Sequence, residues 1–306
     1  MIEISELTKR YGDRTAVDQL SFTVRPGRVT GFLGPNGAGK TTTLRMILGL
    51  DTPTGGTATV SGVPFRGHRR GLRHVGALLD AGHVHGGRTA TAHLTALARS
   101  NGIPPRRVRE VLDEVGLTDA AGRRIGGFSL GMKQRLGIAT ALLGDPPVLL
   151  FDEPINGMDP EGVLWVRRLF RRLAAEGRTV FLSSHLMSEM ENTADQLVVI
   201  GRGRLIAAEP LADFAARGTR LSVVAGSPRA VELAAVLAAA GASVEPRGPA
   251  DAGRIAVTGL PADRIGALAL EHRIQLTELT TQAASLEEAF MELTADSAEH
   301  LAGHRR

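Results

Sequence analysis

Residues 34–41 are of types that can hold a triphosphate. Their sequence, Gly-Pro-Asn-Gly-Ala-Gly-Lys-Thr, has the spacing G-x-x-x-x-G-K-T. Glycines let backbone N–H groups turn toward the β- and γ-phosphates, Lys40 supplies a positive charge, and Thr41 offers a hydroxyl to Mg²⁺. The sequence therefore predicts a phosphate-binding loop, with binding residues Gly34, Pro35, Asn36, Gly37, Ala38, Gly39, Lys40, Thr41 and Thr42.

Two elements must position this loop. The apolar run 29–33 predicts a short buried strand before it, and residues 41–50 predict a helix after it. The N-terminal end of a helix attracts anions through its dipole and its free N–H groups. A strand, the loop and a helix, in that order, are the context that the motif requires.

A second candidate site lies at residues 148–153, where four apolar residues precede Asp152 and Glu153. The pattern is typical of a buried parallel strand that ends in carboxylates. Asp152 can orient Mg²⁺ through its water shell, and Glu153 can act as a general base on the water that attacks the γ-phosphate. The alternative is an acidic pair that meets solvent at a strand end, and the phosphate loop upstream makes it the less favoured reading.

Residues 128–135, Phe-Ser-Leu-Gly-Met-Lys-Gln-Arg, resemble the signature segment of ATP-binding cassette (ABC) ATPases. The resemblance covers roughly residues 1–210. It implies an α/β fold of the P-loop NTPase class, with an ABC core and a helical subdomain, and it implies ATP and Mg²⁺ as ligands. By this resemblance, Tyr11 stacks on adenine, Val17 lines the same pocket, and His185 joins Glu153 as a catalytic residue at the γ-phosphate.

The resemblance also implies a homodimer. A helical insert that ends in the signature segment would carry it away from its own phosphate loop, toward the loop of a second copy. Ser129 and Gly131 would then touch the γ-phosphate that the second copy holds. Residues 156–159, which include Asp159, are similar to the D-loop of the family and are expected near the nucleotide.

The chain departs from the family pattern at two places. In the signature segment, Leu130 replaces a glycine and Met132 replaces a glutamine. At the position of the usual glutamine after residues 75–79, the chain has Asp80, whose carboxylate could bind the metal or its water. Both departures resemble the ATPase subunits of drug-resistance-type exporters, such as those that act on bacitracin or daunorubicin.

Composition limits the class of protein. The chain has no cysteine, which excludes disulfides and thiolate metal sites, and its formal net charge is +4. No apolar stretch approaches the ~18 residues that cross a bilayer, and no signal peptide is recognised at the N-terminus. We therefore expect a peripheral protein on the cytoplasmic face of the membrane, with a separate multi-spanning permease as partner and no specific nucleic acid.

The pattern changes near residue 218. We expect an ABC ATPase domain over 1–215, with its helical subdomain at about 80–145, and an accessory α/β domain of ferredoxin-like character over 219–306. In the accessory domain the sequence predicts strands at 221–224, 242–245, 254–257 and 274–277. It predicts helices at 229–240, 262–272 and 285–293.

Two functions follow from these observations. The favoured one is the ATP-hydrolysing subunit of an ABC exporter, in which ATP-driven dimerisation powers a separate permease. The alternative is an ABC ATPase that acts on ribosomes or DNA without transport. A P-loop GTPase is disfavoured because the chain has no N-K-x-D guanine motif. The sequence does not identify the transported substrate.

Overall fold

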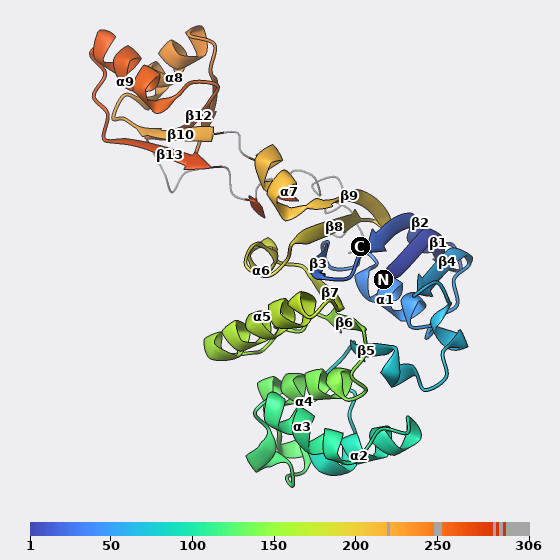
Figure 1. Ribbon diagram of the computed structural model, residues 1–306. Coiled ribbons are helices and arrows are strands. Elements are labelled where there is room, and N and C mark those ends of the chain that lie inside the picture. Colours follow the sequence, from blue (N-terminus) through green and yellow to red (C-terminus); the bar gives the residue numbers. More distant parts are fainter. Residues whose placement is uncertain (219–220, 248–252, 284–285, 288–289, 292–306) are drawn as a thin grey trace. The chain divides into compact units, whose positions relative to one another are not determined.

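The computed structural model describes residues 1–218, 221–247, 253–283, 286–287 and 290–291 (Figure 1). The chain divides into two compact units, one containing Met1–Leu211 and the other Ala212–Glu292. Each unit has its own sheet and its own hydrophobic core. Within the described residues, no helix is both long enough and apolar enough to cross a membrane.

The first unit is built on a six-stranded sheet. Its strand order is β5-β6-β7-β3-β8-β9, in which the first five strands are parallel and β9 is antiparallel to β8. Every residue of β6 and β7 is buried, as expected for parallel strands that are covered on both faces. The strands are β3 (Arg28–Leu33), β5 (Val75–Leu78), β6 (Val148–Asp152), β7 (Thr179–Ser184), β8 (Gln196–Gly201) and β9 (Arg204–Pro210).

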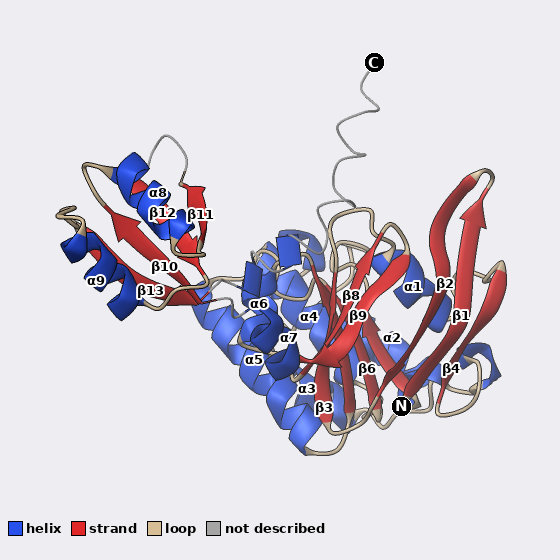
Figure 2. Cartoon of the chain, turned by 90° about the horizontal axis from the view of Figure 1, so that it is seen from above, coloured by secondary structure: helices blue, strands red, loops and turns tan. Residues whose placement is uncertain are grey.

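A three-stranded antiparallel sheet lies beside it, in the order β2-β1-β4 (Figure 2). Its strands are β1 (Ile2–Tyr11), β2 (Arg14–Val24) and β4 (Gly55–Val60). Helix α1 (Lys40–Ile47) contacts both sheets through β2, β4 and β6. Phe22 of β2 packs against Phe32 and Phe181 of the larger sheet, with ring centroids 5.7 and 5.9 Å away. These rings join the two sheets into one core.

Three longer helices lie in the interval between β5 and β6. Helix α4 packs directly on β5, and α2 and α3 pack on α4 and on each other. Thr89 and Ser129 accept hydrogen bonds from the first turns of α2 and α4, which is how these side chains begin a helix. The helices are α2 (Ala90–Ser100), α3 (Arg106–Glu114) and α4 (Leu130–Leu142). Short 3₁₀ turns precede β5 at Phe65–Gly67 and Gly71–Arg73, and two more lie between α3 and α4 at Thr118–Ala120 and Ile125–Gly127.

The remaining helices of the first unit follow β6 and β7. Helix α5 (Pro160–Ala175) begins after Asp159, whose carboxylate accepts a hydrogen bond from the N–H of Gly162 at 2.8 Å. It packs on β3 and β7. The short helix α6 (Met187–Glu191) follows β7 and also contacts β3. Helix α7 (Leu211–Gly218) begins where the chain leaves β9, at the boundary between the two units, and its residues from Ala212 on belong to the second unit.

The second unit has a four-stranded antiparallel sheet in the order β11-β12-β10-β13. Along the chain, its elements alternate as strand, helix, strand, strand, helix, strand. This topology confirms the predicted ferredoxin-like character. Helices α8 and α9 pack side by side, and Leu233, Leu237 and Ile265 fill the core under them. The elements are β10 (Leu221–Gly226), α8 (Ala230–Ala239), β11 (Ser243–Pro246), β12 (Arg254–Thr258), α9 (Ala262–Glu271) and β13 (Glu278–Ala283).

One predicted strand of this unit is wrong. The sequence analysis placed it at 274–277, but β13 begins at Glu278. Ile274 is buried because its N–H donates to Ala269 O at 2.8 Å and folds the side chain back onto the core after α9. The apolar side chain of Ile274 therefore belongs to the turn that follows α9 and not to a strand. The helix predicted over 285–293 falls largely outside the described residues.

Candidate active site

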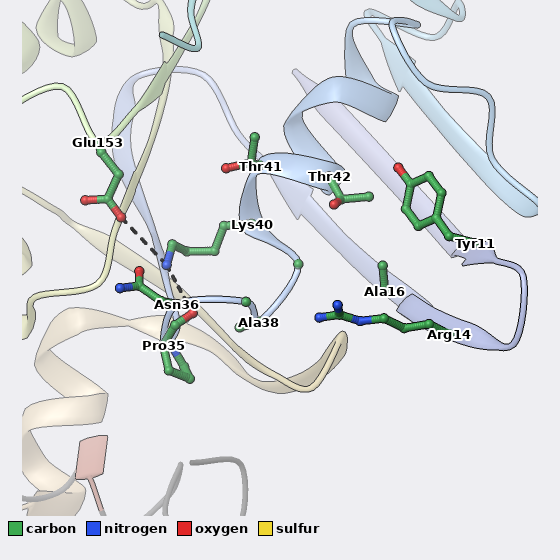
Figure 3. Close-up of a pocket in the computed structure, with 12 residues that line it drawn as sticks. Tyr11, Arg14, Ala16, Pro35, Asn36, Ala38, Lys40, Thr41, Thr42 and Glu153 are labelled. Atoms are coloured by element: carbon green, nitrogen blue, oxygen red, sulfur yellow. Dashed lines mark hydrogen bonds and ion pairs between the residues drawn. The ribbon is translucent and has the colours of Figure 1, made fainter. Parts of the chain in front are cut away.

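A pocket of about 500 Å³ opens where β3 ends and α1 begins (Figure 3). The loop between these elements forms its floor, Glu153 lies on one side, and Tyr11 and Arg14 lie on the opposite side. The strand–loop–helix order predicted from the sequence is present. The lining residues are Tyr11, Arg14, Ala16, Pro35, Asn36, Gly37, Ala38, Gly39, Lys40, Thr41, Thr42 and Glu153.

Lys40 is the cation at the centre of this pocket. Its side chain is only 7% exposed, and its Nζ donates to Gly34 O at 2.6 Å and Pro35 O at 3.3 Å. The same Nζ lies 3.7 Å from Glu153 Oε1. Burial lowers the pKa of Lys40, and the carboxylates of Glu153 and Asp152 act in the opposite direction. A phosphate group that enters the loop would meet a cation already directed into it.

Asp152 joins three elements through hydrogen bonds. The hydroxyl of Thr41, in α1, donates to Asp152 Oδ2 at 2.6 Å, and the hydroxyl of Ser183, in β7, donates to Asp152 Oδ1. Ser183 reaches this carboxylate because the parallel register pairs it with Asp152. A hydroxyl and a carboxylate are hard oxygen donors of the kind that Mg²⁺ prefers, so these residues fit a magnesium site.

Glu153 follows directly and turns toward the pocket. Its Oε2 lies 3.0 Å from His185 Nδ1 and accepts a hydrogen bond from Asn156 Nδ2 at 3.4 Å. Its backbone N–H donates to Ser183 Oγ at 3.1 Å. The carboxylate thus has His185 and Asn156 on one oxygen and Lys40 near the other. A carboxylate held in this way at a pocket wall can accept a proton from a bound water.

Near His185 lies a half-buried acid, Glu189, that the sequence analysis did not single out. The hydroxyl of Ser184 donates to Glu189 in α6, and burial raises the pKa of Glu189. Asn156 belongs to the segment 156–159 that the sequence analysis compared with the D-loop, but it was not assigned a role. Ser183, two residues before His185, was not assigned one either. For Glu189 the sequence offers no motif. Only its helical spacing from His185, four residues on, places it nearby.

The pocket does not include every residue expected at the nucleotide. Val17 is fully buried and does not line it. The carboxylate of Asp80 bends back onto its own loop, where it accepts from the N–H of Gly82 at 2.6 Å and lies 3.3 Å from His83 Nε2. The metal-binding role of Asp80 stays a prediction.

The residues expected at a second copy's nucleotide also lie outside the pocket. Ser129 caps α4 by accepting from the N–H of Met132 at 3.2 Å, and Gly131 belongs to the same first turn. Asp159 caps α5.

Tyr11 does line the pocket, but its hydroxyl donates to Asp51 Oδ2 at 3.1 Å.

The fold and this pocket define a nucleotide-binding protein of the P-loop class. The sequence matches the ABC transporter family over residues 17–156, and residues 221–287 match a domain of unknown function, DUF8746. The bacitracin transport ATP-binding protein BcrA of Bacillus licheniformis is 44% identical over 209 residues, which is 67% of this chain and 68% of that protein. The chain therefore belongs to the family of ABC transporter ATP-binding proteins.

Other relatives and solved structures agree with this assignment. An uncharacterised ABC transporter ATP-binding protein of Bacillus subtilis (strain 168), YhcH, is 41% identical over 67% of this chain and 68% of its own length. The structure of an ATP-binding subunit of an ABC transporter is 28% identical, with a TM-score of 0.65 over 71% of this chain and 92% of that one. A dimeric bacterial ABC transporter cassette, 23% identical, shares the fold with a TM-score of 0.64, over 69% of this chain and 99% of that one.

Proposed function

We propose that this chain is the ATP-hydrolysing subunit of an ABC exporter. The observation that carries the proposal is the position of Glu153 at the wall of the phosphate-loop pocket, between Lys40 and His185. Export is supported by the relatives, whose names include bacitracin transport, lantibiotic transport and Nod factor export. These names favour transport over the alternative of an ABC ATPase that acts on ribosomes or DNA.

ATP would enter with its phosphates in the loop and its base toward Tyr11. Lys40 would then exchange the carbonyl oxygens of Gly34 and Pro35 for phosphate oxygens. Thr41 and Asp152 would hold Mg²⁺, which adds positive charge beside the phosphates when it is bound. The free N–H groups at the start of α1 would bind the same phosphate oxygens.

Hydrolysis requires a base that accepts a proton while water attacks the γ-phosphorus. Glu153 would take this proton as the new P–O bond forms and the bond to ADP breaks. The contacts of His185 and Asn156 to Oε2 fix the orientation of the carboxylate. In this role His185 also faces the γ-phosphate, as expected from the family resemblance.

Ser129 and Gly131 would serve the ATP site of a second copy. Neither residue lines the pocket of its own chain, and both lie at the N-terminal end of α4, a position that favours an anion through the helix dipole. Two copies placed head to tail would hold two ATP molecules between them, and hydrolysis would remove the shared ligand. The resulting opening would drive a separate membrane permease from the cytoplasmic face.

The test is the turnover of the Glu153→Gln variant. Because glutamine keeps the shape but cannot accept the proton, we expect the rate of ATP hydrolysis to fall about 100-fold or more. The variant should still bind ATP and should elute as a dimer in its presence. Glu245→Gln, at an exposed position of the second unit, is the matched control and should hydrolyse ATP at the wild-type rate. An unchanged rate in Glu153→Gln would exclude Glu153 as the base.

A further inference from the structure

We propose that Leu130 is a positioning residue that connects the signature segment to the loop that carries Glu153. Leu130 is the residue that stands in place of a glycine of the family pattern. Its side chain reaches across to Gly157 in the D-loop, four residues after Glu153. The effect of this link on hydrolysis rests on the proposed function, but the contact itself does not.

The contact between Leu130 and Gly157 leaves no space for a further atom. A β-carbon added at Gly157 would lie 2.1 Å from Leu130 Cδ2 and 2.7 Å from its Cγ. Gly157 also has φ +74°, a conformation that other residues rarely adopt. The leucine methyl therefore packs directly on the backbone of the D-loop. A glycine at position 130 would have no atoms to make this contact.

A second contact from the same helix reaches the same loop. Gln134, one turn after Leu130 and only 7% exposed, donates from Nε2 to Asn156 O at 3.2 Å. Asn156 in turn donates from its side chain to Glu153 Oε2. The first two turns of α4 thus hold the backbone of the D-loop at two adjacent residues, and the D-loop holds the Glu153 carboxylate.

The link is not explained by ordinary core packing. Leu130 is 52% exposed, so its burial contributes little to the stability of the fold. The role proposed for Leu130 is instead to connect the signature segment with the D-loop. In the proposed dimer, Ser129 contacts the nucleotide of the second copy, while Glu153 acts on the nucleotide of its own chain. Leu130 therefore connects the two ATP sites through one polypeptide, and ATP at one site affects the base at the other.

The first experiment compares Leu130→Ala with Leu164→Ala. Leu164 in α5 has the same exposed fraction, 52%, and serves as the matched control. For Leu130→Ala we expect kcat for ATP hydrolysis to fall about 10-fold, since a small misplacement of a catalytic group is costly. We expect the Kd for a fluorescent ATP analogue to stay within about twofold and the Hill coefficient for ATP to fall toward 1. A leucine with a merely structural role would leave the Hill coefficient unchanged.

The second experiment tests the contact by enlarging the side chain at position 157 and removing the side chain at position 130. Gly157→Ala alone should lower kcat further than Leu130→Ala, because the new methyl would meet Leu130 Cδ2. Adding Leu130→Gly removes the obstructing side chain but not the backbone strain of an alanine at φ +74°, so the double variant should regain only part of the activity that Gly157→Ala loses. A double variant no more active than Gly157→Ala alone, or wild-type kinetics in Leu130→Ala, would overturn the proposal.

Hydrogen exchange separates this inference from the proposed function. In the nucleotide-free protein, the amides of residues 155–158 should exchange faster in Leu130→Ala than in wild type or in Leu164→Ala. Wild-type protein that does not hydrolyse ATP would overturn the proposed function. The exchange rates would still show whether Leu130 holds the D-loop, because they are measured without nucleotide. Equal exchange rates in the three proteins would show that Leu130 does not hold the D-loop.

Discussion

The Glu153 carboxylate contacts groups from three separate parts of the chain. Lys40 comes from the phosphate loop, His185 follows β7, and Asn156 comes from the D-loop. A second acid, Glu189, lies near His185, where it is half-buried and accepts a hydrogen bond from Ser184.

Glu189→Gln should increase the stability of the protein at neutral pH. Burial raises the pKa of Glu189 in the folded state above its unfolded value, so ionisation favours the unfolded chain. The stability that the protonated form provides is complete below the unfolded pKa, near 4.5, and is lost as pH rises through the folded pKa. Glutamine stays neutral and can still accept from Ser184. We expect the Tm at pH 7.5 to rise by about 1–3 °C.

The pH dependence of this difference is the decisive measurement. The Tm gain of Glu189→Gln should shrink as pH falls toward 4.5, because wild-type Glu189 is then protonated as well. Glu191→Gln, an exposed position on the same short helix, controls for the general loss of negative charge. A gain that does not depend on pH would show that the effect does not come from ionisation of Glu189.

At the scale of elements, β5 and α4 pack tightly against each other. At Gly76 in β5, an added β-carbon would lie 1.9 Å from Ala141 O in α4. The absence of a side chain at this position allows the helix to lie directly on the strand. Helix α4 also begins with Ser129 and contains both residues that hold the D-loop. The position of the helix on β5 therefore determines where the signature segment lies.

Gly76→Ala should destabilise the first unit by about 3 kcal/mol, because the new methyl overlaps a backbone oxygen that can move only with its helix. Gly122→Ala is the matched control, since a β-carbon at Gly122 meets no atom within 4 Å. Urea denaturation followed by the fluorescence of Trp165, the only tryptophan, measures both changes. Equal midpoints for the two variants would contradict the packing described here.

The sequence predicted most of the elements around the nucleotide but few of the contacts between them. The strand within residues 148–153 could be predicted because a strand buried on both faces needs consecutive apolar residues. The phosphate loop could be predicted because its glycines, lysine and threonine have a fixed spacing. Contacts between distant residues leave no such pattern. The contact of Leu130 with Gly157 joins positions 27 residues apart, and the half-buried position of Glu189 depends on how α6 packs. Ile274 misled the strand prediction because one buried residue fits either a strand or a helix end.

At the scale of the whole molecule, the chain joins an ATPase unit to a second unit with its own core. The first contains the complete pocket, and the second has a ferredoxin-like topology with two helices on its sheet. The residues proposed to act in catalysis all lie before residue 190. The chemistry of ATP is therefore expected from the first unit, and the proposed export role requires a membrane protein as its partner.

Affinity capture of the full chain from detergent-solubilised native membranes should test this partnership. We expect a multi-spanning membrane protein to co-purify in stoichiometric amount, because a peripheral ATPase must bind its permease to drive it. Mass spectrometry identifies the partner, and a tagged unrelated protein serves as the control. Recovery of ribosomal or DNA-bound proteins without a membrane protein would replace the export proposal with the alternative.

The strand order also has a mechanical consequence. Strand β3, which leads into the phosphate loop, has a hydrogen-bonded neighbour on each side. Among the described residues, β5, on which α4 packs, is an edge strand that pairs only with β6. A load applied to the protein is shared by two neighbours at β3 and by one at β5. The loop that holds ATP is thus built into the stiff part of the sheet. The helices α2, α3 and α4 pack at the edge of the sheet next to β5. A force from a partner is therefore expected to displace these helices more than it displaces the phosphate loop.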